Sequence, residues 1–170
     1  YMMTNAIGTI NLFEAILNVD IKPRILLSCT PEEFGDVPES MIPITEETRI
    51  KPINPYAASK AAQDMVAITY FASYGIPIIR TRAFNHEGPR RDINGAIASF
   101  AYQIACIENN LQKNTIEVGN LSAKRNFTHV VDMVKAYCLA MKKGKDGELY
   151  LISSNMIFTI KTNNIFAAVD

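Results

Sequence analysis

The sequence predicts an α/β fold, part of a doubly wound (Rossmann-like) parallel sheet with helices on both faces. Short apolar runs of strand length alternate along the chain with longer segments of helical periodicity. The run "RILLSC" at 24–29 is densely apolar, which is typical of strands covered on both faces, as in parallel sheets. With 170 residues, 48% of them hydrophobic, the whole chain 1–170 is expected to form a single α/β domain.

The first part of the chain is expected to contain two helices and one strand. Residues 4–19 place apolar side chains at helical spacing, and "RILLSC" at 24–29 follows as a buried strand. A long loop with four prolines then leads to the second helix. This helix is expected over residues 55–74, because Asn54 is a favourable N-cap and Pro55 a favourable first helical residue.

The middle of the chain continues the alternation of strands and helices. "PIIRTRAF" at 77–84 is expected to be a buried strand, and residues 85–95 a polar loop punctuated by glycine and proline. A helix is expected over 96–110, followed by a strand "TIEVGN" at 115–120.

The last part is expected to contain one more helix and one more strand. "AKRNFTHVVDMVKAYCLAMKKGKDG" at 123–147 reads as a loop leading into a helix, and "ELYLIS" at 148–153 as a strand. The chain opens inside a predicted helix and stops at "TNNIFAAVD", where a further helix would begin. We therefore expect the sequence to be a piece of a longer protein.

Composition excludes several classes of protein. The 17 basic and 17 acidic side chains balance, so neither a nucleic-acid partner nor a membrane is indicated. No apolar run approaches the roughly 20 residues that a membrane span needs, and the first residues lack the features of a signal peptide. Cys29, Cys106 and Cys138 are isolated and lack metal-ligand spacing, so we expect no metal site and a reducing, cytoplasmic setting.

Polar residues follow two of the predicted strands at the point where each strand ends. Thr30 and Glu32 follow the first strand, and Asn85 and His86 follow the second. In open parallel sheets, ligands bind beyond the carboxyl ends of the strands. These loops are therefore the expected position of a functional site.

The stretch "NPYAASKAA" at 54–62 places a tyrosine and a lysine four positions apart on the second predicted helix. Side chains at i and i+4 are neighbours on one helical face, so Tyr56 and Lys60 are expected to lie close together. A free tyrosine has a pKa near 10, and a nearby ammonium group favours the phenolate. Tyr56 is thus a candidate general base, although a half-buried tyrosine beside a solvated lysine would give the same pattern.

Five stretches together resemble one known family: "NAIGTINLFEA", "CTPEEFG", "NPYAASKAA", "RTRAFNHEGPRR" and "VGNLSAKRNFTHVVDMVKAY". The set is similar to the extended short-chain dehydrogenase/reductases that modify nucleotide sugars, above all GDP-mannose 4,6-dehydratases and GDP-4-keto-6-deoxymannose reductases. The resemblance implies NADP or NAD as cofactor and a nucleotide-sugar substrate such as GDP-mannose. It also implies that the helix carrying Tyr56 packs in a homodimer, and that Asn5 hydrogen-bonds near the active site.

The resemblance further assigns roles to particular side chains. The catalytic set would be Thr30, Glu32, Tyr56 and Lys60, with Glu32 as the base of a dehydratase. Cofactor binding would involve Tyr56, Lys60, Asn85 and His86, and substrate binding would involve Asn85, Asn120 and Arg125, whose guanidinium suits a diphosphate.

The sequence departs from the family pattern in several places. The glycine-rich turn that cradles the cofactor pyrophosphate is absent, so the chain reads as the middle half of a family member and is expected to be inactive alone. Phe34 stands where tyrosine is usual, and the loop after Arg91 lacks a Phe-Val-Thr-like stretch. A 4-keto reductase, a 4-epimerase and a truncated non-catalytic module therefore remain alternatives to the dehydratase.

Overall fold

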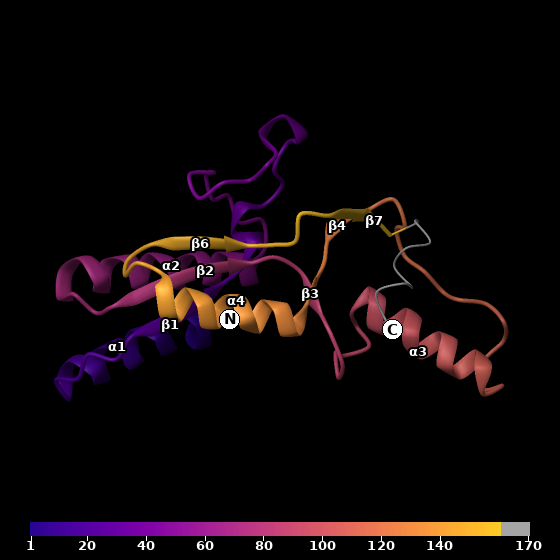
Figure 1. Ribbon diagram of the computed structural model, residues 1–170, viewed down its shortest axis with the longest axis horizontal. Coiled ribbons are helices and arrows are strands. Elements are labelled where there is room, and N and C mark those ends of the chain that lie inside the picture. Colours follow the sequence, from indigo (N-terminus) through magenta and orange to yellow (C-terminus); the bar gives the residue numbers. More distant parts are fainter. Residues whose placement is uncertain (161–170) are drawn as a thin grey trace. The chain divides into compact units, whose positions relative to one another are not determined.

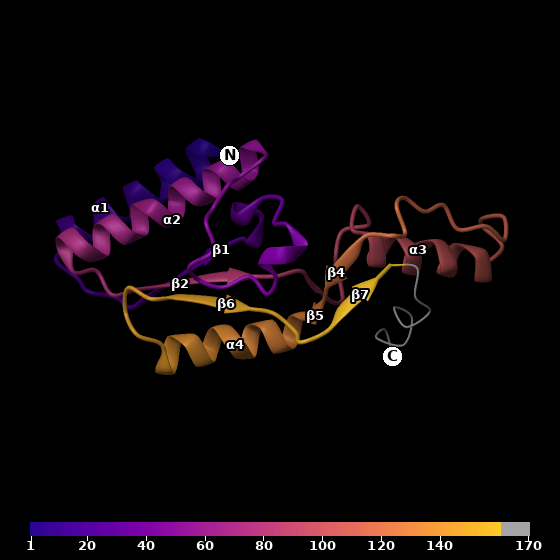
Figure 2. The ribbon, with the colours of Figure 1, turned by 90° about the horizontal axis from the view of Figure 1, so that it is seen from above.

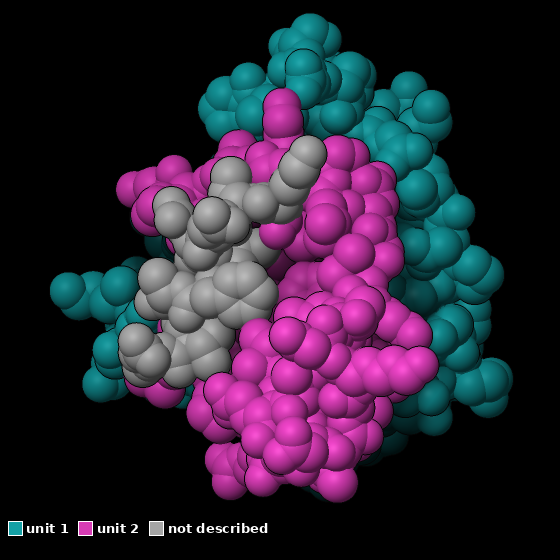
Figure 3. Space-filling model, turned by 90° about the vertical axis from the view of Figure 1, so that its right-hand side faces the viewer, with its two compact units in different colours: residues 1–84, 132–152 teal, residues 85–131, 153–170 magenta. Residues whose placement is uncertain are grey.

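The computed structural model describes residues 1–160 and divides into two compact units, coloured separately in Figure 3. The first unit takes residues 1–84 and 132–152, and the second takes 85–131 and the residues from 153 onward. The further helix expected to begin at "TNNIFAAVD" lies outside the described residues.

A three-stranded parallel sheet forms the centre of the first unit. Strands β1 (Ile25–Cys29), β2 (Ile78–Ala83) and β6 (Leu149–Ile152) lie in the order β1-β2-β6. Strand β1 pairs in parallel with β2, where Leu26 lies opposite Ile79, and β2 pairs in parallel with β6. All three strands therefore run in the same direction. This confirms the predicted α/β class with a parallel sheet.

Helices cover both faces of this sheet, as Figures 1 and 2 show. Helices α1 (Gly8–Asn18) and α2 (Pro55–Tyr74) lie on one face, and α4 (Val130–Lys143) lies on the other. A π-helical turn, η1 (Met3–Ile7), precedes α1. The central strand β2 is buried at five of its six positions, because its side chains meet helices on either side.

The main core lies between the sheet and the α1/α2 layer. Apolar side chains from both helices meet those that β1 and β2 direct toward them, and this contact gives the helical periodicity its physical cause. The buried members of this cluster are Phe13, Ile16, Leu27, Cys29, Ala67, Ile76 and Ile78.

The outer face of α2 differs from the sequence expectation. The helix is apolar nearly all round, which predicts burial on all sides. Most of its buried positions nevertheless lie on one stripe, which includes Ala57, Ala61 and Ala67, while Met65 is 43% exposed and Ile68 is 37% exposed. Among the described residues, α2 packs against the sheet, α1, η1 and the turn after β1, and Met65 and Ile68 border a hollow that they share with residues 46–50.

The second unit contains one helix and two small sheets. Strand β3 (His86–Glu87) pairs in parallel with β5 (Thr128–His129), and β4 (Lys124–Asn126) pairs in antiparallel fashion with β7 (Ile157–Thr159). Helix α3 (Ala96–Glu108) supplies the third component of this unit.

The strand predicted over residues 115–120 does not form. The side chain of Gln103 on α3 holds this segment in an irregular conformation, because its Oε1 accepts from Glu117 N at 2.7 Å and its Nε2 donates to Glu117 O at 3.0 Å. Gln112 adds a hydrogen bond from Nε2 to Thr115 O at 2.8 Å. The backbone is thus paired with side chains instead of with a neighbouring strand.

The long loop between β1 and α2 contains two short 3₁₀ turns. These are η2 (Pro31–Phe34), directly after β1, and η3 (Glu39–Met41). Among the helices that the structure describes, none has both the length and the apolar character needed to cross a bilayer.

Candidate active site

The turn after β1 is fixed by a reciprocal cap. Thr30 ends the strand, and its Oγ1 accepts a hydrogen bond from Glu32 N at 3.4 Å while its own N–H donates to Glu33 Oε1 at 3.1 Å. Pro31 supplies the first position of η2. The cap turns Glu33 inward, where it is fully buried, and leaves Glu32 exposed. Two adjacent glutamates therefore meet opposite environments.

Glu33 belongs to a buried cluster of charges beneath the turn. Its Oε2 accepts from Arg82 Nε at 2.9 Å, and Arg82 Nη2 also donates to Asp64 at 2.6 Å. Arg80 Nη1 donates to the other oxygen of Asp64 at 2.9 Å. The two acids and two arginines balance in charge, which is the condition for burying ionic groups. Phe34 lies against the Arg82 guanidinium, 4.7 Å from ring centroid to Cζ.

This cluster fastens the turn to β2 and α2, because Arg82 comes from the strand and Asp64 from the helix. Burial raises the pKa of the Glu33 carboxyl, while the Thr30 N–H and the Arg82 guanidinium act in the opposite direction. The cluster therefore gives Thr30 a rigid position at the end of β1.

The helix that carries Tyr56 begins at a strong local signal. Asn54 Oδ1 accepts from Ala57 N at 2.7 Å, and Pro55 occupies the first helical position. The helix ends at Gly75, which has φ of 68° in the left-handed region. The bounds predicted for this helix are confirmed.

Tyr56 lies half-buried beside the turn. Burial raises its pKa above the ordinary 10.0, the Glu32 carboxylate raises it further, and a hydrogen bond with the Thr30 hydroxyl lowers it. The ring edge of Tyr1 packs on it, with centroids 5.6 Å apart. The pKa of Tyr56 is therefore raised in this structure, because burial and the neighbouring carboxylate outweigh the hydrogen bond with Thr30.

The Lys60 ammonium is held by two acceptors. It donates to Ser28 O in β1 at 2.8 Å and to Gln63 Oε1 at 2.8 Å. Gln63 Nε2 in turn donates to Thr9 Oγ1 on α1 at 2.9 Å. The lysine is thus linked to the strand that leads to Thr30 and to both helices on this face of the sheet.

Asn5 lies in the π-helical turn, a feature that is frequent at functional sites. Its Nδ2 donates to Ser59 Oγ at 2.9 Å, and Ser59 donates to the main-chain oxygen of Tyr56 at 2.7 Å. Thr9 closes the chain of contacts by donating to Asn5 O at 2.7 Å. Asn5 therefore reaches the candidate site through one intermediate serine.

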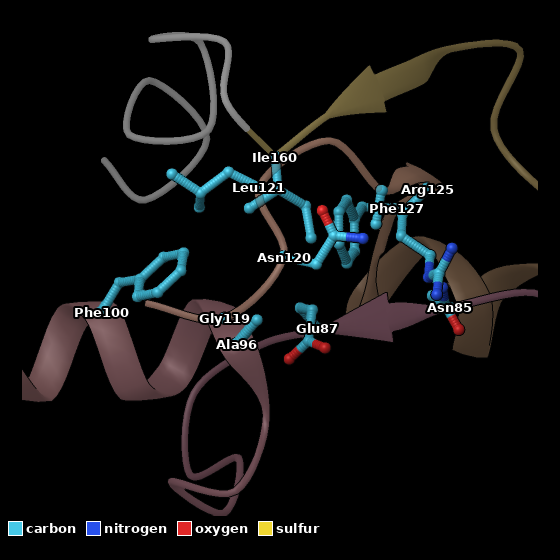
Figure 4. Close-up of a pocket in the computed structure, with 11 residues that line it drawn as sticks. Asn85, Glu87, Ala96, Phe100, Gly119, Asn120, Leu121, Arg125, Phe127 and Ile160 are labelled. Carbon is cyan, nitrogen blue, oxygen red and sulfur yellow. The ribbon is translucent and has the colours of Figure 1, made fainter. Parts of the chain in front are cut away.

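The second unit contains a pocket of about 430 Å³, shown in Figure 4. Asn85, Asn120 and Arg125 all line it, together with the rings of Phe100 and Phe127. Asn120 Oδ1 accepts from Ser122 N at 2.9 Å, and Arg125 Nη1 donates to Lys124 O at 2.9 Å. The pocket thus combines a guanidinium, the Glu87 carboxylate, two amides and aromatic surface.

The structure groups the predicted site residues within the two units. Thr30, Glu32, Tyr56 and Lys60 come together in the first unit, and Asn85, Asn120 and Arg125 share the pocket of the second. His86 lies in β3, paired with Thr128. Residues 1–160 contain no group of histidine, cysteine or acidic side chains that could hold a metal ion.

Three residues with roles in the site geometry were not singled out as site residues from the sequence: Asn54, Ser59 and Gln63. Asn54 was expected only as a helix cap, yet its Nδ2 also donates to Glu32 Oε2 at 2.9 Å. Ser59 and Gln63 share the helix with Tyr56 and Lys60, each three positions after one of them. That i, i+3 spacing is the signal that would have indicated them.

A parallel sheet with a Thr30 turn at its carboxyl edge and a helix bearing Tyr56 and Lys60 defines an extended short-chain dehydrogenase/reductase of the nucleotide-sugar epimerase and dehydratase class. The chain belongs to the family described as GDP-mannose 4,6 dehydratase, which matches residues 1–170.

Two curated relatives illustrate the range of activities in this family. The chain is 34% identical over 153 residues to a GDP-6-deoxy-D-mannose reductase of Pseudomonas aeruginosa, covering 90% of this chain and 50% of the reductase. It is 32% identical over 159 residues to a GDP-mannose 4,6-dehydratase of Vibrio cholerae, covering 92% of this chain and 48% of the dehydratase. The chain thus spans about half the length of these relatives.

Solved structures confirm the fold. The structure of RMD from Pseudomonas aeruginosa complexed with NADPH matches with a TM-score of 0.93 and 32% identity, over 99% of this chain and 58% of that one. A dTDP-glucose 4,6-dehydratase from Bacillus anthracis in complex with NAD matches with a TM-score of 0.79 and 31% identity, over 92% and 48%.

Proposed function

We propose that residues 1–170 form part of a longer GDP-mannose 4,6-dehydratase and carry its catalytic side chains. The observation that carries this proposal is the meeting of three groups at the end of β1: the Thr30 hydroxyl, the Tyr56 phenol and the Glu32 carboxylate. Oxidation of a sugar hydroxyl needs the first two, and elimination of water needs a further base. The length of the relatives, about twice that of this chain, supports a larger parent protein.

The residues present fit a dinucleotide cofactor, NADP or NAD. An ammonium group has three donors, and Lys60 uses two of them on Ser28 O and Gln63 Oε1, which leaves one for a ribose hydroxyl. Tyr56 and Lys60 would hold the ribose next to the nicotinamide. When bound, the cofactor would accept hydride from C4 of the sugar and later return it to C6.

Tyr56 and Thr30 would act on the C4 hydroxyl. The phenolate form of Tyr56 would take the proton of this hydroxyl as the C4–H bond is broken, and the Thr30 hydroxyl would orient the same oxygen. Because Thr30 is fastened by the cap and the charge cluster below it, its hydroxyl is fixed relative to the phenol before substrate arrives.

Glu32 would carry out the elimination. Once C4 is a ketone, the C5 proton is acidified; the Glu32 carboxylate would remove this proton and pass it to the C6 hydroxyl, so that the C6–O bond breaks, water leaves and a C5–C6 double bond forms. An exposed carboxylate close enough to Tyr56 to raise its pKa is suitably placed for a base that acts one carbon away from C4.

The pocket of the second unit would bind the nucleotide part of the substrate. The Arg125 guanidinium suits the diphosphate, and the side chains of Asn85 and Asn120 offer amides to the sugar or the nucleotide. Phe100 and Phe127 supply aromatic surface for a base.

A reductase is the second candidate, favoured by the 34% identity to the GDP-6-deoxy-D-mannose reductase. Reduction of a 4-keto sugar, or 4-epimerisation, uses Tyr56 and Lys60 without an elimination step. The test is product analysis of the full-length protein with NADP or NAD. A dehydratase converts GDP-mannose into a product lighter by one water, whereas a reductase ignores GDP-mannose and consumes a supplied 4-keto-6-deoxy sugar.

We further propose a homodimer formed through the outer face of α2. Met65 and Ile68 are apolar side chains of this helix that are 43% and 37% exposed. A non-catalytic module would form the same dimer but would convert no substrate. Equilibrium sedimentation tests the dimer, and the product assay then separates an enzyme from such a module.

A further inference from the structure

Both the oxygen and the nitrogen of the Asn54 side-chain amide form hydrogen bonds. Its Oδ1 accepts the hydrogen bond from Ala57 N that caps α2, at 2.7 Å, and its Nδ2 donates to Glu32 Oε2 at 2.9 Å. One planar group thus joins the first turn of the Tyr56 helix to the carboxylate after β1.

The cap fixes the direction of the donor. An amide is planar, so once Oδ1 is held by the helix, the position of Nδ2 follows, and with it the position of the carboxylate oxygen that it binds. Among the described residues, no group donates to the other oxygen, Glu32 Oε1. The carboxylate is therefore held by one oxygen, and the second is free to accept a proton.

Capping alone does not require asparagine at this position. Serine, threonine and aspartate satisfy the same helix N–H groups about as well, but none of them carries an NH₂ donor beside the capping oxygen. The property that distinguishes Asn54 from other good caps is the donor that it directs to Glu32.

We propose that Asn54 is a positioning residue that orients the Glu32 carboxylate for proton removal at C5. This inference rests on the proposed dehydratase function, because it concerns the base of the elimination step. Asn54 acts through Glu32 and through the start of α2, so one side chain orients both the Glu32 carboxylate and the first turn of the helix that carries Tyr56.

The experiment uses the full-length parent protein with Asn54→Ser and Asn54→Asp. Both variants keep a good cap, so Asn54→Ser should leave the melting temperature nearly unchanged, whereas in Asn54→Asp the favourable charge at the helix N-terminus is opposed by repulsion from Glu32. Asn54→Ser should leave oxidation at C4 unchanged, followed as the burst of reduced nicotinamide, and should slow release of the 4-keto product about tenfold. Asn54→Asp should slow it more, because a second carboxylate faces Glu32.

Two controls separate positioning from a general effect. Asn114→Asp introduces the same charge on an exposed loop and should change neither step. In a Glu32→Gln background, Asn54→Ser should have no further effect on product release, because the carboxylate that it orients is gone. A crystal structure of Asn54→Ser should show the Glu32 carboxylate displaced, a result that does not depend on turnover.

Each contrary result has a defined meaning. Equal slowing of both steps by Asn54→Ser, or a lowered melting temperature of this variant, would reduce Asn54 to a structural cap. Full product release by Asn54→Ser, with Glu32→Gln inactive and the carboxylate undisplaced, would overturn the inference and leave the dehydratase intact. A wild-type protein that does not dehydrate GDP-mannose would overturn the proposed function and, with it, this role of Asn54.

Discussion

The Lys60 ammonium donates a hydrogen bond to the main-chain oxygen of Ser28, 2.8 Å away, and so ties helix α2 to strand β1. The same ammonium holds Gln63, which reaches Thr9 on α1. Lys60 therefore has a structural role that exists before any ligand binds. This role distinguishes it from a lysine that only adjusts the charge near Tyr56.

Replacing Lys60 by methionine should accordingly lower stability as well as activity. The change keeps the length of the side chain but removes both hydrogen bonds, and the free energy of unfolding should fall by about 1–3 kcal/mol. Gln63→Met is the comparison, because it removes the bonds of Gln63 to Lys60 and to Thr9 but keeps the bond from Lys60 to Ser28 O, so it reports the loss of stability without the loss of the tie to β1. Chemical denaturation measures both, and equal stability of Lys60→Met and the wild type would contradict the structural role.

Replacing Tyr56 by phenylalanine tests the proposed acid–base role. The ring and its packing against Tyr1 remain, while the phenolic proton is lost, so cofactor binding should persist and turnover should fall by about two orders of magnitude or more. Tyr102→Phe, an exposed change of the same kind on α3, should leave turnover unchanged. Undiminished turnover in Tyr56→Phe would remove the phenol from the mechanism.

The pKa of Tyr56 should respond with opposite signs to changes in its two neighbours. The absorbance titration of the wild type minus that of Tyr56→Phe isolates this phenol, and its midpoint should lie above 10.0. Glu32→Gln should lower the midpoint, because a negative charge that opposes the phenolate is removed. Thr30→Val should raise it, because a hydrogen bond that favours the phenolate is lost.

The raised pKa of Tyr56 also has a consequence for stability at alkaline pH. Above pH 10 the unfolded chain loses this proton first, so the folded state binds more protons. The contribution of Tyr56 to the free energy of unfolding therefore falls as pH rises from 10 through the folded-state pKa. The fall should be smaller in Tyr56→Phe, and identical alkaline denaturation of the two proteins would argue against a raised pKa.

Gly35 is predicted to be essential to the turn that holds Glu32. It has φ of 66°, and a Cβ at this position would lie 2.0 Å from Lys51 O, whereas Gly75 has nearly the same φ with nothing within 4 Å of its Cβ position. Gly75→Ala should therefore cost about 1 kcal/mol of backbone strain alone. Gly35→Ala should cost about 3 kcal/mol or more, since the backbone must also move. Similar denaturation midpoints for the two variants would contradict the close contact.

The parts of the fold that were predicted correctly depend on local signals. Helix α2 has the bounds expected from its sequence, because Asn54 and Pro55 determine its start and Gly75 its end through interactions within a few residues. The segment 115–120 has β-favouring residues, but its backbone is paired with Gln103, and that contact is not visible in local sequence.

In the candidate site, too, local motifs were predicted correctly and contacts between residues far apart in the sequence were not. Thr30, Glu32, Tyr56 and Lys60 were expected from motifs with fixed spacing. The buried pairing of Glu33 with Arg82 was not expected, because the two residues are 49 positions apart and their opposite charges meet only when the sheet forms. The raised pKa of Tyr56 was also missed, since it depends on how much of the ring is buried and on how close Glu32 comes to it.

The last prediction separates dehydratase from reductase through Glu32. Removing the C5 proton requires a carboxylate, whereas reduction of an existing 4-keto group requires only Tyr56 and a hydride donor. Glu32→Gln keeps the size of the side chain and an acceptor for the Asn54 amide, but it removes the base. In the full-length parent this variant should still oxidise GDP-mannose at C4, seen as reduced nicotinamide that accumulates, and should release little 4-keto-6-deoxy product.

Glu47→Gln is the control for this change, because it replaces an exposed carboxylate in the loop before α2 and should leave product release unchanged. Normal product release by Glu32→Gln would show that another group removes the C5 proton. If the wild type instead leaves GDP-mannose unchanged and reduces a supplied 4-keto sugar, the elimination role of Glu32 is wrong, because Tyr56 and Lys60 then suffice for the chemistry and the reductase takes the place of the dehydratase.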